Sequence, residues 1–163
     1  MSSASATALR LEEITPDNVL DACALRVHPL QEKFVAPVAR SLAEAYASPG
    51  IAWPRLIMDG DELVGFVMAF FDVRFDEKNP DDRPRSGLWR LNIAATHQGC
   101  GYGRFAVEAV AEEIRRRGGT RITVTWKPGE HGPEEFYRTL GFEPTGEMSE
   151  DELVGEMDIA PLP

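Results

Sequence analysis

The sequence has few of the residues from which metal sites are built. It contains two cysteines, Cys23 and Cys100, and three histidines, His28, His97 and His131. The cysteines form no CxxC pair, and the histidines do not have the spacing of a zinc site. We therefore expect no bound metal, and we expect Cys100 to contribute its backbone rather than its thiol.

Long hydrophobic runs and a basic leader are also missing. The longest apolar run, Leu63 to Phe71, is far shorter than the roughly 20 residues that a membrane-spanning helix needs. Met1 to Thr7 is small and polar, and it lacks the charged start and apolar centre of a signal peptide. We expect residues 1–7 to be a disordered tail. We also expect a cytoplasmic protein that has no membrane as a partner.

Positive charge is scarce. The chain has 17 lysines and arginines against 27 aspartates and glutamates, which gives a formal net charge of −10. Nucleic acids and anionic membranes bind basic surfaces, so this balance argues against nucleic acid as a partner. A cationic substrate would suit the charge.

Length and composition are those of one globular domain. The 163 residues are 43% hydrophobic and 27% charged, and they are numerous enough to bury a substantial core. The sequence shows no internal repeat, low-complexity block or linker. We expect a single domain over residues 8–163.

The most informative stretch runs from Leu88 to Arg117. A short apolar segment, 88–93, is followed by glycines on alternate positions from 99 to 103, and then by a segment with the apolar spacing of an amphipathic helix. A strand, a glycine loop and a helix in this order direct several backbone N–H groups at one anion. This stretch therefore predicts a phosphate or pyrophosphate site.

The glycine loop is neither a Walker P-loop nor a dinucleotide fingerprint. No Gly-Lys-Ser/Thr follows the glycines, and Arg104 stands where the third glycine of the dinucleotide motif belongs. The loop does contain Gln-x-x-Gly-x-Gly, formed by Gln98, Gly101 and Gly103. This pattern resembles motif A of the GCN5-related N-acetyltransferases (GNAT), whose loop wraps the pyrophosphate of coenzyme A.

A second motif lies at the expected distance. Residues 136–142 read FYRTLGF, which resembles motif B of the same superfamily, FYxxxGF. The 38 residues between Gln98 and Tyr137 leave room for one helix and one strand, as that fold requires. The upstream segments 31–46 and 63–68 look like the bacterial spermine/spermidine acetyltransferase branch.

The resemblance implies a cofactor, a reaction and a set of site residues. The cofactor is acetyl-CoA, and the acceptor is a primary amine of a small molecule, with polyamines such as spermidine and spermine first. Dimers are common in the superfamily, so the resemblance also allows a homodimer. Tyr137 is the catalytic general acid that protonates the departing thiolate, and the amine attacks directly. The implied cofactor-binding residues are Leu91, Asn92, Ile93, Gln98, Gly99, Cys100, Gly101, Tyr102, Gly103, Arg104 and Phe136.

The rest of the pattern completes an α/β fold. A hairpin turn at Asp59-Gly60-Asp61 joins two strands, 55–58 and 63–73, and residues 31–47 have helical spacing that Pro37 should kink or break. Together with the resemblance, this predicts the GNAT fold: a mixed, mostly antiparallel central sheet of about six to seven strands flanked by about four helices.

The sequence departs from the family in two places. Glu130 stands where many members carry an asparagine that contacts the pantetheine arm, which puts that contact in doubt. Many members also place a glutamate general base on the central strand, but the strand 88–93 has no carboxylate, so the base is left open. Because an attacking amine must lose a proton, Glu32, Asp72 and Glu130 are candidate bases or substrate contacts. Two alternatives to the small-molecule enzyme remain: a non-catalytic domain that binds or senses acyl-CoA, and a protein N-acetyltransferase.

Overall fold

One seven-stranded sheet organises the chain. The computed structural model describes residues 8–161. The strands lie in the order β1-β2-β3-β4-β5-β7-β6, and all neighbours are antiparallel except β4 and β5. The strands are β1 Leu9–Glu12, β2 Ala52–Asp59, β3 Glu62–Val73, β4 Arg85–Ile93, β5 Arg121–Trp126, β6 Glu143–Ser149 and β7 Glu152–Asp158.

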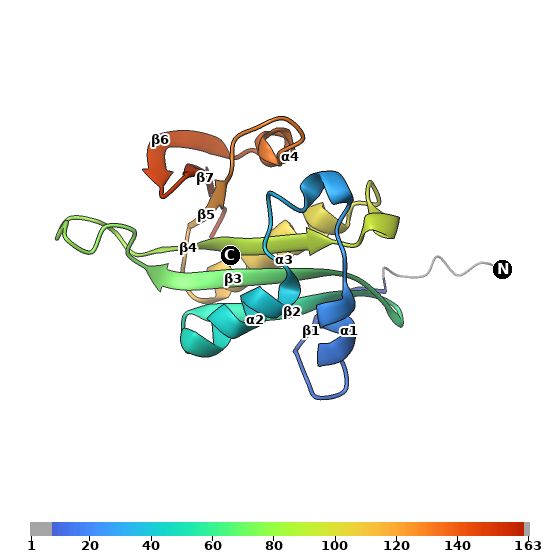
Figure 1. Ribbon diagram of the computed structural model, residues 1–163. Coiled ribbons are helices and arrows are strands. Elements are labelled where there is room, and N and C mark those ends of the chain that lie inside the picture. Colours follow the sequence, from blue (N-terminus) through green and yellow to red (C-terminus); the bar gives the residue numbers. More distant parts are fainter. Residues whose placement is uncertain (1–7, 162–163) are drawn as a thin grey trace.

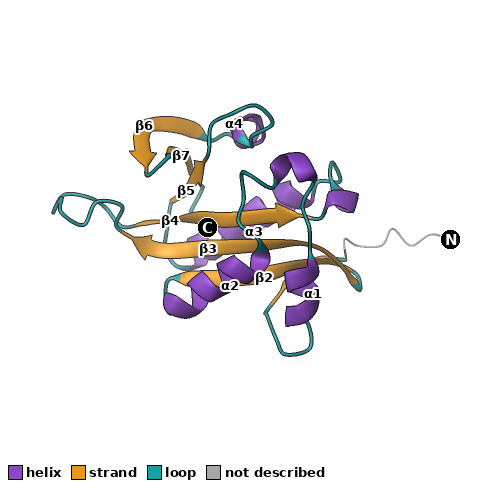
Figure 2. Ribbon diagram, in the orientation of Figure 1, coloured by secondary structure: helices purple, strands orange, loops and turns teal. Residues whose placement is uncertain are grey.

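Helices cover both faces of the sheet (Figures 1 and 2). The helices are α1 Val19–Ala24, α2 Val38–Ala47, α3 Tyr102–Arg116 and α4 Glu134–Leu140, with short 3-10 turns at Pro29–Gln31 and Ala95–His97. In Figure 1, α1 and α2 lie in front of β2 and β3, and α3 lies behind the sheet. The larger core lies under α3, whose apolar stripe is buried against the centre of the sheet.

The two halves of the sheet meet over a very short contact. β4 and β5 pair only at Gly87 with Thr123 and at Leu88 with Val124. A Cβ atom at Gly87 would lie 1.7 Å from the Thr123 carbonyl oxygen, so this approach requires glycine. Beyond these pairs the strands separate, and within residues 8–161 the C-terminal half of β4 has no partner strand on its β5 side.

A bulge in β4 lies where the two strands separate. On β3, Met68 pairs with Arg90 and Ala69 pairs with Leu88, which leaves Trp89 as an extra residue in β4. A bulge bends its strand and changes the direction of the side chains near it. Here the bulge directly follows Leu88, the last residue of β4 that pairs with β5.

The predicted fold is confirmed. The helical segment predicted over residues 31–47 is broken at Pro37, as one of the two expected outcomes, but only its second part is a helix: α2 begins at Val38 with Pro37 as its N-cap. Proline has no N–H to donate and a φ that suits a helix start, so it begins this helix and does not bend it. The predicted disordered tail, 1–7, lies outside the described residues. Among the residues that the structure describes, no helix is long and apolar enough to cross a membrane.

Candidate active site

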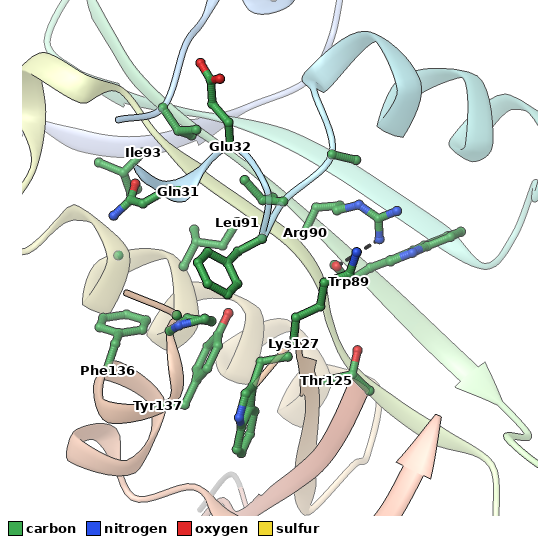
Figure 3. Close-up of a pocket in the computed structure, with 18 of the residues that line it drawn as sticks. Gln31, Glu32, Trp89, Arg90, Leu91, Ile93, Thr125, Lys127, Phe136 and Tyr137 are labelled. Carbon is green, nitrogen blue, oxygen red and sulfur yellow. Dashed lines mark hydrogen bonds between the residues drawn. The ribbon is translucent and has the colours of Figure 1, made fainter. Parts of the chain in front are cut away.

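A cavity of about 970 Å³ lies where β4 and β5 separate. Its walls come from the ends of β4 and β5, from the N-terminal end of α3 and from α4. The segment 31–37, part of α2 and the β6–β7 turn complete it. Figure 3 shows the side chains of Leu91 and Ile93 on one side, and those of Phe136 and Tyr137 on another. We call this space the wedge cavity.

Free backbone N–H groups form one end of the wedge cavity. Gly101 is the N-cap of α3 with φ +82°, and Gly99 has φ +74°. Within the described chain, the N–H groups of residues 102–104 have no acceptor, and no side chain caps the helix. The first turn of a helix with unused N–H groups attracts an anion, which the helix dipole reinforces. A Cβ at Gly99 or Gly101 would meet nothing within 4 Å, so this surface is open to a ligand.

Gly103 has a different reason to be glycine. A Cβ at this position would lie 3.0 Å from Cζ of Phe136 and 3.8 Å from Cδ2 of Leu91. The missing side chain lets α3 approach α4 and β4 closely. The three glycines of the loop thus do two tasks: two permit the backbone to turn, and one permits close packing.

Gln98 connects the glycine loop to the segment 31–37, which we call the strap. Its Nε2 donates to the Ile93 carbonyl at 2.8 Å, and its amide exchanges hydrogen bonds with the amide of Gln31 at 3.2 and 3.3 Å. On the other side of the cavity, the ring of Phe34 packs over Gly129 and Gly132. The strap therefore crosses the wedge cavity and contacts both of its sides.

The side chain of Asn92, on β4, holds the strap through a hydrogen bond. Leu91 and Ile93 line the wedge cavity, whereas Asn92 lies outside its lining. The Asn92 side chain is buried, and its Nδ2 donates to the Ala36 carbonyl at 3.0 Å. The resemblance implied a cofactor contact through the backbone of Asn92, and that contact stays a prediction; its side chain holds the strap.

Tyr137 is the one tyrosine of α4, and its ring is buried among aromatic rings. Ring centroids of Trp126, Phe136 and Phe142 lie 5.6, 5.2 and 5.6 Å from that of Tyr137. In Figure 3 its hydroxyl points into the wedge cavity, toward the strand that carries Leu91. Burial raises the pKa of Tyr137 far above its ordinary value, and the charge of Glu152 adds to this. The phenol is therefore a neutral proton donor at any physiological pH.

The sequence analysis missed charged groups at the other end of the wedge cavity. Glu44 of α2 accepts from Arg90 at 3.2 Å and from Arg40 at 2.9 Å, and all three line the cavity. Burial lowers the pKa of Arg90, which the charge of Glu44 opposes. The pair joins residues 46 positions apart, so no local pattern could reveal it. The acidic turn at 150–152 was visible in the sequence, but its place beside the cavity was not.

Sequence comparison assigns the chain to a family. The acetyltransferase (GNAT) family matches residues 21–142, which is most of the chain. The chain belongs to the GNAT family. It is 29% identical to N-acetyltransferase 8 of Rattus norvegicus over 101 residues, which cover 62% of this chain and 44% of that protein. The chain thus spans less than half the length of this curated relative.

Solved structures of low sequence identity share this GNAT fold. An aminoglycoside 6'-N-acetyltransferase complexed with coenzyme A superposes with a TM-score of 0.67 at 19% identity, over 94% of this chain and 99% of that one. Naa50 of Arabidopsis thaliana, in complex with a bisubstrate analogue, superposes with a TM-score of 0.62 at 19% identity, over 92% and 98%.

The three carboxylates singled out in this GNAT sequence lie in different places. Glu32 lines the wedge cavity, but its carboxylate points away from Tyr137 in Figure 3. Asp72 has φ +55° and is not among the residues that line the cavity; its backbone N–H donates to the Ser86 hydroxyl at the far end of β4. Glu130 is exposed beside His131 and does not line the cavity. The structure therefore brings only Glu32 near the site.

Proposed function

We propose that this chain is an acetyl-CoA-dependent N-acetyltransferase that acetylates a primary amine of a small molecule, with polyamines as the first candidates. One observation carries the proposal. The free N–H groups of α3 and the buried hydroxyl of Tyr137 open into the same cavity, between strands that have separated. Acetyl-CoA supplies the activated acetyl thioester.

The residues of the wedge cavity fit coenzyme A. The N–H groups of residues 98–104 would hold its diphosphate, because two positive-φ glycines expose the backbone there. Leu91 and Ile93 would lie along the pantetheine arm, and the unpaired edge of β4 offers backbone groups to its amides. Phe136 packs beside Gly103 and closes the space behind the loop.

Tyr137 would supply the proton that the leaving thiolate takes up. Its pKa is raised by burial, so the hydroxyl keeps its proton until the sulfur atom develops negative charge. With a neutral phenol as the acid, a deprotonated amine can attack the thioester directly, without an acyl-enzyme. Cys100, which is exposed and donates weakly to the Gln98 carbonyl at 3.6 Å, has no part in this scheme.

We propose Glu152 as the group that receives the proton of the amine, directly or through water. A free alkylamine has a pKa near 10.4 and must be deprotonated to attack. Glu152 lines the wedge cavity, and its charge acts on both Tyr137 and Arg90. Glu32 stays a candidate for binding the charge of the acceptor at the rim. Asp72 and Glu130 do not take part in this proposal because they lie outside the cavity lining.

The acidic turn favours a cationic acceptor. Glu150, Asp151 and Glu152 follow one another at the cavity, and Lys127 lies 3.8 Å from Asp151 alone. A polyamine has several ammonium groups, of which one would be acetylated while another meets this turn. The formal charge of the chain, −10, acts in the same direction over a longer range.

A thiol-release assay tests the proposal. Purified protein is mixed with acetyl-CoA and with spermidine, spermine, a panel of other amines or a peptide with a free N-terminus. Release of free thiol with a polyamine, absent when the amine is omitted, is the expected result. Binding of CoA without transfer to any acceptor would favour the sensing domain, and transfer to the peptide alone would favour a protein N-acetyltransferase.

A further inference from the structure

We propose that the β2–β3 hairpin positions the glycine loop through two side-chain pairs, Asp59 with Tyr102 and Glu62 with His97. This inference rests on the proposed coenzyme A site, because the loop is the part of that site that holds the diphosphate. Asp59 and Glu62 lie outside the wedge cavity, so they would be positioning residues that act through the loop.

The first pair holds the helix end of the loop. Tyr102 is the first residue of α3, and its hydroxyl donates to Oδ2 of Asp59 at 2.6 Å. Asp59 is the last residue of β2, so the contact joins parts of the chain 43 residues apart. This hydrogen bond to the carboxylate raises the pKa of Tyr102 to about 12. The hydroxyl therefore stays a donor over the whole working range of pH.

The second pair holds the strand end of the loop. Nε2 of His97 lies 2.9 Å from Oε1 of Glu62, the first residue of β3, and Nδ1 lies 2.8 Å from the Thr96 hydroxyl. Both ring nitrogens thus have partners, and the imidazole has no free nitrogen for a ligand. Its ring also lies 6.0 Å from that of Tyr102, so the two contacts are adjacent.

Gln98 is held by its own side chain, but residues 99–101, which lie between it and Tyr102, have little else to order them. Two of them are glycines with positive φ, and glycine loses more conformational freedom than any other residue when it is fixed. Their N–H groups make no hydrogen bonds within the described chain. A ligand that binds a loose loop must pay the entropy of ordering it, so a loop held at both ends binds more tightly. The hairpin holds the loop in place through Asp59 and Glu62. Neither of these side chains lines the wedge cavity, so removing them would take away no contact with the ligand.

The test uses the hairpin residues, because neither touches the ligand. In Asp59→Ala/Glu62→Ala, we expect the calorimetric Kd for CoA to rise about five- to twentyfold. This is less than the loss of two charge-assisted hydrogen bonds to the ligand would cause, because the pairs hold the loop and not the ligand. The KM for acetyl-CoA should rise equally, while kcat and the KM for the amine stay unchanged. Asp59→Asn/Glu62→Gln keeps both acceptor oxygens and should restore most of the affinity. Asp61→Ala, on the same turn, is the matched control and should bind CoA like the wild type.

Several outcomes would overturn the inference. One is a Kd for CoA in the double alanine variant equal to that of the wild type. The others are equal losses in the Asp61→Ala control, no rescue by the Asn/Gln variant, or a parallel fall in kcat, all of which would mean a general structural role. A failure of the proposed function alone would look different. The wild type would bind CoA and the variants would change the Kd as expected, but no amine would be acetylated. A wild type that does not bind CoA would refute both.

Discussion

The rings of Tyr137 and Trp126 stack with their centroids 5.6 Å apart and their planes 26° apart. Trp126 ends β5 and is itself fixed against β7, where a Cβ at Gly155 would lie 2.4 Å from its six-membered ring. The position of the Tyr137 hydroxyl therefore follows from packing that reaches back to the sheet. Both residues line the wedge cavity, and the hydroxyl of Tyr137 points into it (Figure 3).

Tyr137→Phe should lower kcat by roughly a hundredfold or more, the usual contribution of a positioned general acid. The ring packing is kept, so the KM for acetyl-CoA and the melting temperature should change little. Steady-state kinetics with the best amine of the panel, together with thermal unfolding, would measure this. An unchanged kcat would remove Tyr137 from the mechanism.

The activity should show no alkaline loss from Tyr137. Burial disfavours the charged phenolate and so raises the pKa of this group. The acid is then fully protonated through about pH 10, where an ordinary tyrosine ionises. We expect kcat to rise with pH as the amine and its base deprotonate, and then to level off. A fall in kcat with a midpoint below about pH 10 would contradict the assignment.

Asn92→Ala should loosen the strap and destabilise the fold by about 1–3 kcal/mol, because the Ala36 carbonyl loses its donor in a partly buried place. The KM for acetyl-CoA should rise as well, since the strap carries Gln31 and Phe34 over the wedge cavity. Urea unfolding and steady-state kinetics would measure both effects.

Ser41→Ala is the matched control for this substitution. Ser41 lies in α2, and its buried hydroxyl has no hydrogen-bond partner within the described chain. Its removal should leave stability unchanged or raise it slightly, because an unpaired buried polar group is costly. Equal destabilisation by both alanine substitutions would mean that the Asn92–Ala36 bond contributes nothing specific.

Local features of the sequence predicted the fold and one end of the site. The glycine loop, the amphipathic α3 and the hairpin turn at 59–61 are each encoded within a few residues, and each appears where it was predicted. The strand order and the parallel β4–β5 contact were not encoded locally. The parallel contact depends on Gly87, whose missing side chain matters because Thr123 lies against it.

The acceptor end of the site could not be predicted, for the same reason. Whether a carboxylate faces the wedge cavity depends on which strand end or turn reaches it. Asp72 and Glu152 look equivalent in sequence, as acidic residues at strand ends, but β3 runs antiparallel to β4 and carries Asp72 to the far end of the sheet. The β6–β7 turn instead brings Glu152 to the cavity. Pro37 was placed correctly as a break, but its effect was to begin α2.

Gly101→Val should abolish CoA binding, and Gly50→Val provides a control with the same backbone strain. Gly101 has φ +82° and Gly50 has φ +80°, and a Cβ at either position would meet nothing within 4 Å. Both substitutions should therefore lower the free energy of unfolding by about 1–2 kcal/mol or more, because a β-branched side chain is placed on a left-handed backbone. Only Gly101 lies at the N–H groups of α3, so only there should the side chain occupy the space that a diphosphate needs. The two variants should therefore lose similar amounts of unfolding free energy. Calorimetric titration should show that CoA binding is lost in Gly101→Val and kept in Gly50→Val. Wild-type affinity in Gly101→Val would show that the loop does not bind the cofactor.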